Sequence, residues 1–93
     1  MTNKPYVDKS LNTWSFLRTF KSDVLDEELM WHRDVNGRYI EVLEGVGWEI
    51  QFDDELPKRM YKGDKFFIPP KAFHRIKRGH TELILKIEEF EGI

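Results

Sequence analysis

Apolar and polar residues alternate along most of the chain with a period of two, which is the spacing of a half-buried β-strand. The alternating stretches that predict strands are residues 14–20, 38–44, 48–52, 65–68, 73–77 and 81–90. No stretch of the sequence predicts a long helix. Short strands at such close intervals are typical of an all-β sandwich or barrel.

The stretches between these strands are less regular. Residues 29–32 predict a short strand that leads into a loop. The charged stretch 21–28 is compatible with either a turn or one helical turn. Asn36-Gly37 predicts a tight hairpin turn. Gly63-Asp64 and Pro69-Pro70 mark two further breaks between strands.

The alternation also assigns side chains to faces. Because residues two apart lie on the same side of a strand, Arg38 shares its face with Ile40 and Val42. The predicted inward residues of the strand 48–52 are Trp48, Ile50 and Phe52. The strand 81–90 alternates Leu83, Leu85 and Ile87 against Ile84, Lys86 and Glu88. The pattern therefore predicts an apolar interior that also receives one arginine.

Composition narrows the class of protein. A chain of 93 residues is expected to form one domain, with residues 1–12 as an N-terminal arm or edge segment and residues 13–90 as the barrel. The absence of cysteine excludes disulfides and thiolate metal sites, and a net charge of −2 gives no general attraction to nucleic acid. No apolar run approaches the ~20 residues that span a bilayer, and no apolar leader is present, so we expect no membrane partner and a cytoplasmic location.

Three residues have the chemistry of metal ligands. His32 and Asp34 are two apart, so on an extended segment they point to the same side. His74 follows a Pro-Pro break at the start of a predicted strand. Two imidazoles and one carboxylate on a common face suit Fe(II) and also Mn(II), Ni(II) or Zn(II), so we expect a divalent metal. No glycine-rich phosphate loop is present, and we expect no organic cofactor.

The spacing of several residues resembles the cupin superfamily. The second cupin motif, G-D-x4-P-x-G-x2-H, matches the stretch from Gly63-Asp64 through Pro69 to His74, with Lys71 in place of the usual glycine. The first motif ends in V-L-x-G, which matches residues 42–45. Counting back from there, His32 and Asp34 fall on the two histidine positions and Arg38 falls on the glutamate.

The resemblance, which covers residues ~29 to 88, implies a small double-stranded β-helix, also called a jelly-roll or cupin barrel. It implies that His32 and His74 keep two of the four metal positions, that Asp34 changes the third conservatively for metal binding, and that Arg38 reverses the charge of the fourth. A narrower likeness, in Phe67-Ile68-Pro69 and in the residues from His74 onward, connects the chain to the cupin module of mannose-phosphate isomerase-type proteins.

Arg38 admits two interpretations. A permanent cation opposes a nearby metal ion unless an anion lies between them, so Arg38 either binds the carboxylate or phosphate of a ligand beside the metal, or pairs with Asp34 and replaces the metal. We expect Arg38, Ile40, Trp48 and Phe66 to contact the ligand, although aromatic residues equally suit a core.

These features leave three functions open. The first is a metal-dependent enzyme, a dioxygenase or a sugar isomerase, that acts on or binds a small anionic or sugar-type ligand. The second is a metal-free binding module for a small anion. The third is an interaction or assembly domain, because the barrel edge is able to pair with another chain, and a homodimer is expected.

Overall fold

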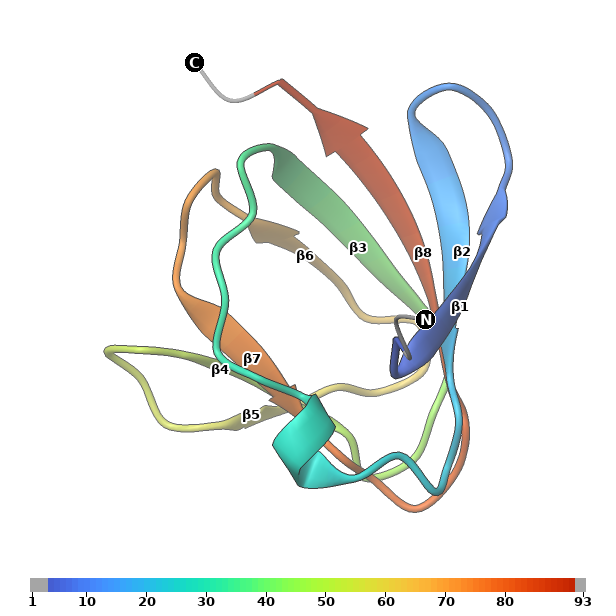
Figure 1. The fold of residues 1–93 in the computed structure, drawn as a ribbon, viewed down its shortest axis with the longest axis vertical. Helices are drawn as coiled ribbons and strands as arrows, with labels where there is room; N and C mark the ends of the chain where they lie inside the picture. The colour runs from blue at the N-terminus through green and yellow to red at the C-terminus, as the bar shows by residue number, and fades with distance from the viewer. Residues whose placement is uncertain (1–3, 92–93) are drawn as a thin grey trace.

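The computed structural model describes residues 4–91, and it is an all-β fold of two antiparallel sheets (Figure 1). One sheet has five strands in the order β1-β2-β8-β3-β6, and the other has three in the order β5-β4-β7. The strands are β1 (Tyr6–Ser10), β2 (Ser15–Phe20), β3 (Gly37–Glu44), β4 (Glu49–Phe52), β5 (Lys58–Arg59), β6 (Lys65–Ile68), β7 (His74–Lys77) and β8 (Leu83–Phe90). The predicted all-β barrel is confirmed.

The core lies between the two sheets and follows the predicted alternation. On β8 the residues Leu83, Leu85 and Ile87 are buried, while Lys86 and Glu88 between them are exposed. Trp48 and Ile50 are buried on the facing sheet, and Ile40 and Val42 are buried on β3. The period of two placed these side chains correctly because one face of each strand is covered and the other faces water.

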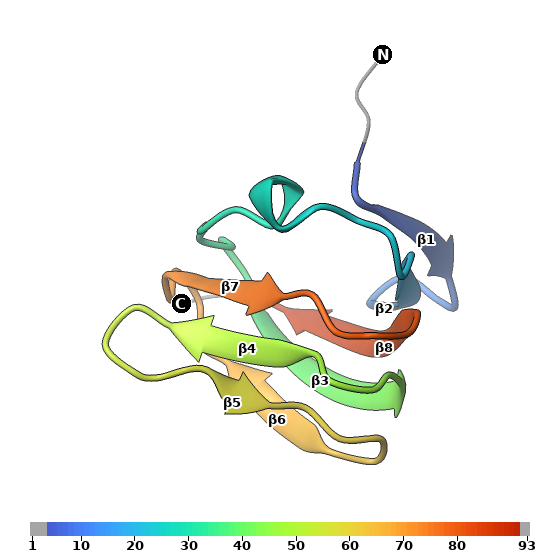
Figure 2. The ribbon, with the colours of Figure 1, turned by 90° about the horizontal axis from the view of Figure 1, so that it is seen from below.

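The segment between β2 and β3 passes from the five-stranded sheet to the edge of β7 and back (Figures 1 and 2). Its residues 26–28 form a single 3₁₀ turn, η1 (Asp26–Glu28), which resolves the ambiguity over residues 21–28. The strand predicted over residues 29–32 is wrong, because only His32 pairs, through one isolated bridge to His74. Within residues 4–91, no helix has the length and apolarity needed to cross a membrane.

The hairpin predicted at Asn36-Gly37 is also wrong. No strand precedes it for β3 to pair with, and Gly37 is instead the first residue of β3. A glycine is required there for a different reason, since a Cβ atom at this position would lie 2.5 Å from Cζ of Phe90. The glycine therefore leaves room for the ring of Phe90 on β8 and does not form a turn.

The predicted N-terminal arm is an edge strand over part of its length. Residues 6–10 form β1, which pairs with β2 and with no other described strand. The first three residues of the predicted arm lie outside the described residues. The alternative of an edge segment, left open for residues 1–12, is the one that the structure supports.

The turn before β7 explains one departure from the cupin motif. Lys71, which stands at the motif's glycine position, has φ of +63° and is the one non-glycine residue with positive φ in the described part of the chain. Its N–H donates to the carbonyl of Asp34 at 2.7 Å. This conformation is strained for any residue with a Cβ atom, and here it ties the turn to the segment that carries Asp34.

Replacing Lys71 tests this strain. The free energy of unfolding of Lys71→Gly is expected to exceed that of Lys71→Ala by about 0.5–1 kcal/mol, because glycine adopts positive φ without a Cβ clash. Urea denaturation measures the difference. The exposed turn residue Lys62, whose φ is not positive, serves as the control position. There the order should reverse, so that Lys62→Gly is less stable than Lys62→Ala. Equal stabilities of Lys71→Gly and Lys71→Ala would contradict the assignment.

Candidate metal centre

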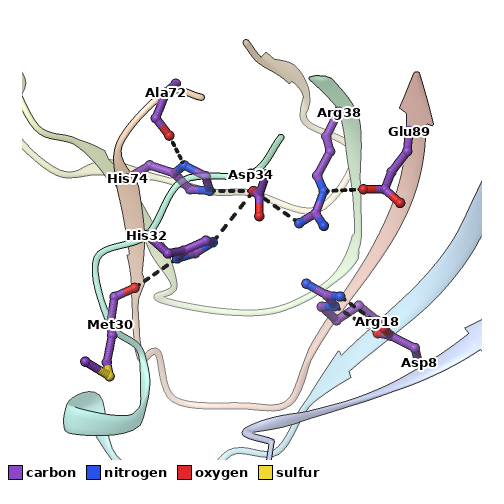
Figure 3. A network of polar contacts seen from close by, with 9 residues as sticks. All are labelled: Asp8, Arg18, Met30, His32, Asp34, Arg38, Ala72, His74 and Glu89. Atoms are coloured by element: carbon purple, nitrogen blue, oxygen red, sulfur yellow. Dashed lines mark hydrogen bonds and ion pairs between the residues drawn. The ribbon is translucent and has the colours of Figure 1, made fainter. Parts of the chain in front are cut away.

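His32 and His74 are brought together by the backbone. The N–H of His32 donates to the carbonyl of His74 at 2.9 Å, and the N–H of His74 donates to the carbonyl of His32 at 3.0 Å. Directly opposed residues of an antiparallel pair place their side chains on the same face. The two imidazole rings accordingly lie 4.4 Å apart, centroid to centroid, and both point toward Asp34 (Figure 3).

Both imidazoles are held in the same orientation. Nδ1 of His32 lies 2.9 Å from the carbonyl oxygen of Met30, and Nδ1 of His74 lies 2.8 Å from that of Ala72. A carbonyl oxygen only accepts hydrogen bonds, so in each ring Nδ1 carries a proton, and in the neutral imidazole Nε2 then presents a lone pair. This is the tautomer that a metal ligand of this type requires, fixed by a backbone partner.

The carboxylate of Asp34 lies between the two lone pairs. Its Oδ2 is 3.4 Å from Nε2 of His74 and 3.7 Å from Nε2 of His32. Oδ2 is also buried, and among the described residues it is the one buried side-chain polar atom without a hydrogen-bond partner. Such an atom is destabilising unless something else satisfies it.

The three donor atoms fit a divalent ion. They lie within 4.8 Å of one another, and the two distances to Oδ2 exceed a hydrogen bond. Metal bonds to histidine nitrogen and carboxylate oxygen are ~2.0–2.2 Å long, so two donors on one ion are at most ~4.4 Å apart. The distances of 3.4 and 3.7 Å from Oδ2 to the two Nε2 atoms lie inside this limit, and a separation near 4.8 Å within the set would have to shorten when an ion binds. A lone-pair nitrogen facing an unpartnered carboxylate oxygen repels it, and a shared cation removes that repulsion.

Arg38 lies beside Asp34 but is held mainly by another residue. Its Nε donates to Oε2 of Glu89 at 3.1 Å, whereas its terminal nitrogen lies 3.3 Å from Oδ2 of Asp34 without hydrogen-bond geometry. We give more weight to the hydrogen bond with Glu89, because the Asp34 contact is an ion pair by distance alone. Glu89 therefore balances the charge of Arg38 and leaves Oδ2 of Asp34 available.

The site opens into a cavity of about 290 Å³. Of the residues predicted to contact a ligand, Arg38, Ile40 and Phe66 line this cavity, as do the three candidate metal ligands. Trp48 does not, and its prediction is corrected here. Its ring is fully buried in the core, with Nε1 donating to the carbonyl of Thr81 at 2.7 Å.

Solved structures with the same two-sheet arrangement identify the fold. A cupin-2 domain containing protein from Shewanella frigidimarina NCIMB 400 superposes with a TM-score of 0.68 at 20% identity, over 96% of this chain and 85% of that one. An inferred mannose-6-phosphate isomerase from Ralstonia eutropha JMP134 gives a TM-score of 0.70 at 14% identity, over 94% and 83% of the two chains. The chain has the cupin fold.

A third structure is larger than this chain. DMSP lyase DddQ from Ruegeria pomeroyi DSS-3 superposes with a TM-score of 0.67 at 16% identity over 82% of this chain, which spans 37% of the lyase. No protein-family model matches the sequence, and no curated protein matches it. Likeness at these identities establishes the cupin fold, and the activity must be argued from the site.

The prediction from the sequence did not identify two charged residues, one that contacts Arg38 and one that lines the cavity. Glu89 belongs to the inward set of β8, two residues after Ile87, and lies opposite Arg38 in the sheet. Arg18 lines the cavity from β2 and shares a face with the buried Phe20. The period of two, which the prediction applied to Arg38, also puts Glu89 on the face of Ile87 and Arg18 on the face of Phe20, but it was not extended to these two residues.

Burial of His74 sets a pH dependence of stability. Its side chain is 4% exposed, and this burial lowers the pKa of His74 below the ordinary value of 6.5. Repulsion from His32 and Arg38 acts in the same direction, whereas the Ala72 carbonyl and Asp34 oppose it. The unfolded chain therefore binds a proton at this residue at a higher pH than the folded chain does.

As the pH falls below 6.5, the free energy of unfolding of the metal-free protein is expected to decrease until the pH passes the folded-state pKa of His74. One proton contributes a slope of up to about 1.4 kcal/mol per pH unit. Urea denaturation at about pH 7.5 and about pH 5.5 measures it. The His74→Gln variant should lose the part of this pH dependence that protonation of His74 causes, whereas His80→Gln, at an exposed histidine, should keep it. Equal slopes of the free energy of unfolding against pH in the wild type and in His74→Gln would refute the assignment.

Proposed function

We propose that this cupin-fold protein binds one divalent transition-metal ion through His32, Asp34 and His74 and holds a small anionic molecule beside it. The observation that carries the proposal is the buried, unpartnered Oδ2 of Asp34 between two imidazole lone pairs. Two histidines and one carboxylate leave coordination positions free for water or a ligand, and they suit Fe(II) with Mn(II), Ni(II) and Zn(II) as alternatives.

The alternative without a metal is an ion pair between Arg38 and Asp34. The 3.3 Å contact between them supports this alternative, but three features oppose it. Arg38 already donates to Glu89, Oδ2 of Asp34 receives no hydrogen bond, and both imidazoles turn their lone pairs toward that oxygen. A metal-free site of this kind would more stably hold a protonated imidazole or a bidentate arginine on Asp34.

Charge supports an anionic ligand. The immediate site holds two neutral imidazoles, the negative Asp34 and Glu89, and the positive Arg38. These charges sum to −1, so a divalent ion would bring the group to +1, and a monoanionic ligand atom on the ion would neutralise it. When bound, the ion supplies Lewis acidity that polarises a ligand oxygen. The residues of the chain orient the ligand and keep its reacting end away from bulk water.

The reaction class stays broad. Two structural neighbours carry names of enzymes that act on small molecules, a DMSP lyase and an inferred mannose-6-phosphate isomerase. A metal-dependent enzyme that rearranges or cleaves a small organic anion is therefore our first candidate, with an isomerase or a dioxygenase as forms of it. The mainly apolar lining of the cavity favours an organic acid over a sugar with many hydroxyl groups.

Metal content tests the proposed centre. The purified protein is expected to take up one Fe(II), Mn(II) or Zn(II) ion per chain. His74→Ala and Asp34→Asn should each lower the affinity at least about tenfold, because the first removes a donor nitrogen and the second removes the negative charge of the donor oxygen. Elemental analysis after dialysis and calorimetric titration measure this, with His80→Ala as a control that should bind like the wild type.

Arg38→Gln separates the metal centre from the ion pair. If Asp34 serves a metal, removing the neighbouring cation should raise the metal affinity or leave it unchanged. If Arg38 replaces the metal, the wild type should take up no metal, and Arg38→Gln should lower stability without creating a tight site. Low metal content in the wild type after addition of all three ions would remove the proposal.

We also propose that two copies of the chain associate through the outer face of the five-stranded sheet. Tyr39, Phe67 and Phe90 form a ring cluster on this face, with centroids 5.1–5.4 Å apart, and Tyr39 and Phe67 are 55% and 41% exposed. The same face carries Lys65 and Lys86 with Glu41 and Glu88. A patch that mixes both signs of charge around exposed rings is able to face a second copy of itself.

Sedimentation of the wild type is expected to show a dimer, and Tyr39→Ser combined with Phe67→Ser should give a monomer. Each substitution removes an exposed ring that would be buried between the copies. Tyr61→Ser, at a tyrosine that is 60% exposed outside this cluster, should leave the dimer intact. A wild-type protein that remains monomeric at high concentration would exclude this assembly.

A further inference from the structure

Two arginines line the cavity, and they differ in the number and exposure of the carboxylates that they contact. Arg38 contacts two carboxylates, Glu89 and Asp34, whose side chains are 28% and 15% exposed. Arg18 contacts one carboxylate of the described chain, Asp8, whose side chain is 36% exposed. The two hydrogen bonds of Arg18 to Asp8, at 2.8 and 3.0 Å, are shorter than the 3.1 Å bond of Arg38 to Glu89. Asp8 is nevertheless the more exposed partner and belongs to the edge strand β1, so it can exchange its place for solvent at a lower cost than a carboxylate inside the site. Of the two cations, Arg18 is the one that a ligand can recruit.

The guanidinium of Arg18 is preorganised. Its Nε and one terminal nitrogen donate to the two oxygens of Asp8 at 2.8 and 3.0 Å. The ring of Tyr6 covers it, with the guanidinium carbon 3.7 Å from the ring centroid. An arginine has five N–H donors, so three are not used by Asp8. The side chain is only 13% exposed and lines the cavity, so a molecule inside the cavity is able to reach the guanidinium.

Arg18 and the metal centre lie at different levels of the barrel. Arg18 is opposite Leu85 on β8 and Arg38 is opposite Glu89 on the same strand. Four residues along a strand correspond to about 13 Å between backbone positions. Figure 3 shows the side chain of Arg18 extending from its strand toward the space below Asp34 and Arg38. A ligand in this cavity therefore meets a metal-binding end and a separate cationic end.

The walls between these ends are apolar. They include Ile40, Ile50, Phe66 and Leu85. A water molecule occupies about 30 Å³ of liquid, so a cavity of about 290 Å³ holds roughly ten non-hydrogen atoms. These dimensions suit a short carbon chain with a polar group at each end.

We infer that the ligand is a short organic acid whose one end binds the metal and whose distal carboxylate binds Arg18, taking the place of Asp8. This inference rests on the proposed metal centre and adds the ligand class and a specificity-determining residue. Asp8 belongs to β1, which pairs only with β2 among the described strands, so its carboxylate is free to move toward solvent without disturbing the sheet. Carboxylate and guanidinium match in a bidentate geometry that Asp8 already demonstrates here.

Calorimetric titration of the metal-loaded protein tests the inference with three matched probes. Glutarate carries two carboxylates, butyrate lacks the distal one, and glutarate monoamide replaces it with an uncharged group of the same size. Glutarate is expected to bind at least about tenfold more tightly than either control, because only glutarate offers an anion to Arg18. Equal affinities, or no binding of any probe by the wild type, would overturn the inference.

Two variants should act in opposite directions. Arg18→Gln should abolish the preference for glutarate, while Asp8→Asn should increase glutarate affinity, because the competing carboxylate is gone. If the Arg18–Asp8 pair were merely structural, both variants would weaken binding or leave it unchanged, and that result would refute the proposal. Arg18→Lys, which keeps the charge but not the fork of donors, should retain part of the preference.

Metal content, measured on the same samples, keeps the two proposals distinguishable. Normal metal content with no preference for glutarate refutes the role of Arg18 alone. Absent metal refutes the proposed centre, and the Arg18 site is then judged by glutarate binding to the metal-free protein. Binding that Arg18→Gln removes supports the anion site without a metal, and binding that Arg18→Gln leaves unchanged rejects it.

Discussion

His32 and His74 exchange backbone N–H and carbonyl groups across two antiparallel segments, and the geometry of the pocket depends on that pair of hydrogen bonds. The segment between β2 and β3 contributes no regular strand, so this bridge is its one ladder contact among residues 4–91. Other hydrogen bonds also hold the segment in place, among them one from the Arg78 side chain to the carbonyl of Val24 at 3.0 Å. The N–H of Lys71 donates to the carbonyl of Asp34, and Arg78 contacts the 3₁₀ turn through its N–H and the carboxylate of Asp26. Loss of the bridge would move His32 and Asp34 away from His74 together.

The charges of the pocket form a second constraint. Arg38 lies 3.3 Å from Oδ2 of Asp34, close enough for an ion pair. Here Glu89 lies across the sheet from Arg38 and accepts its Nε hydrogen bond, which leaves Oδ2 of Asp34 without a hydrogen bond. The arrangement of Arg38, Glu89 and Asp34 decides whether the Asp34 carboxylate binds a metal ion or pairs with Arg38.

The cavity and the core share residues. Ile40, Ile68, Leu85 and Ile87 belong to the buried core and also line the cavity. A barrel of 93 residues has few apolar side chains to bury, and an unfilled hollow removes dispersion contacts from those it has. Keeping a hollow of about 290 Å³ inside so small a fold is therefore a destabilising feature, and occupancy by a ligand or metal would offset it.

The sequence by itself determined the all-β class, the strands β2, β3, β4, β6, β7 and β8 and their inward faces, because a period of two is a local property that burial of one face imposes on each strand. It did not give β1 or β5 as strands. It also placed His32, Asp34 and His74 at one site, through motif spacing rather than geometry. Only the tertiary structure decided that Trp48 belongs to the core, that Glu89 neutralises Arg38, and that Arg18 reaches the cavity from β2. Each of these depends on which strands are neighbours across the sheets, and strand order is set by long-range pairing that no local pattern encodes.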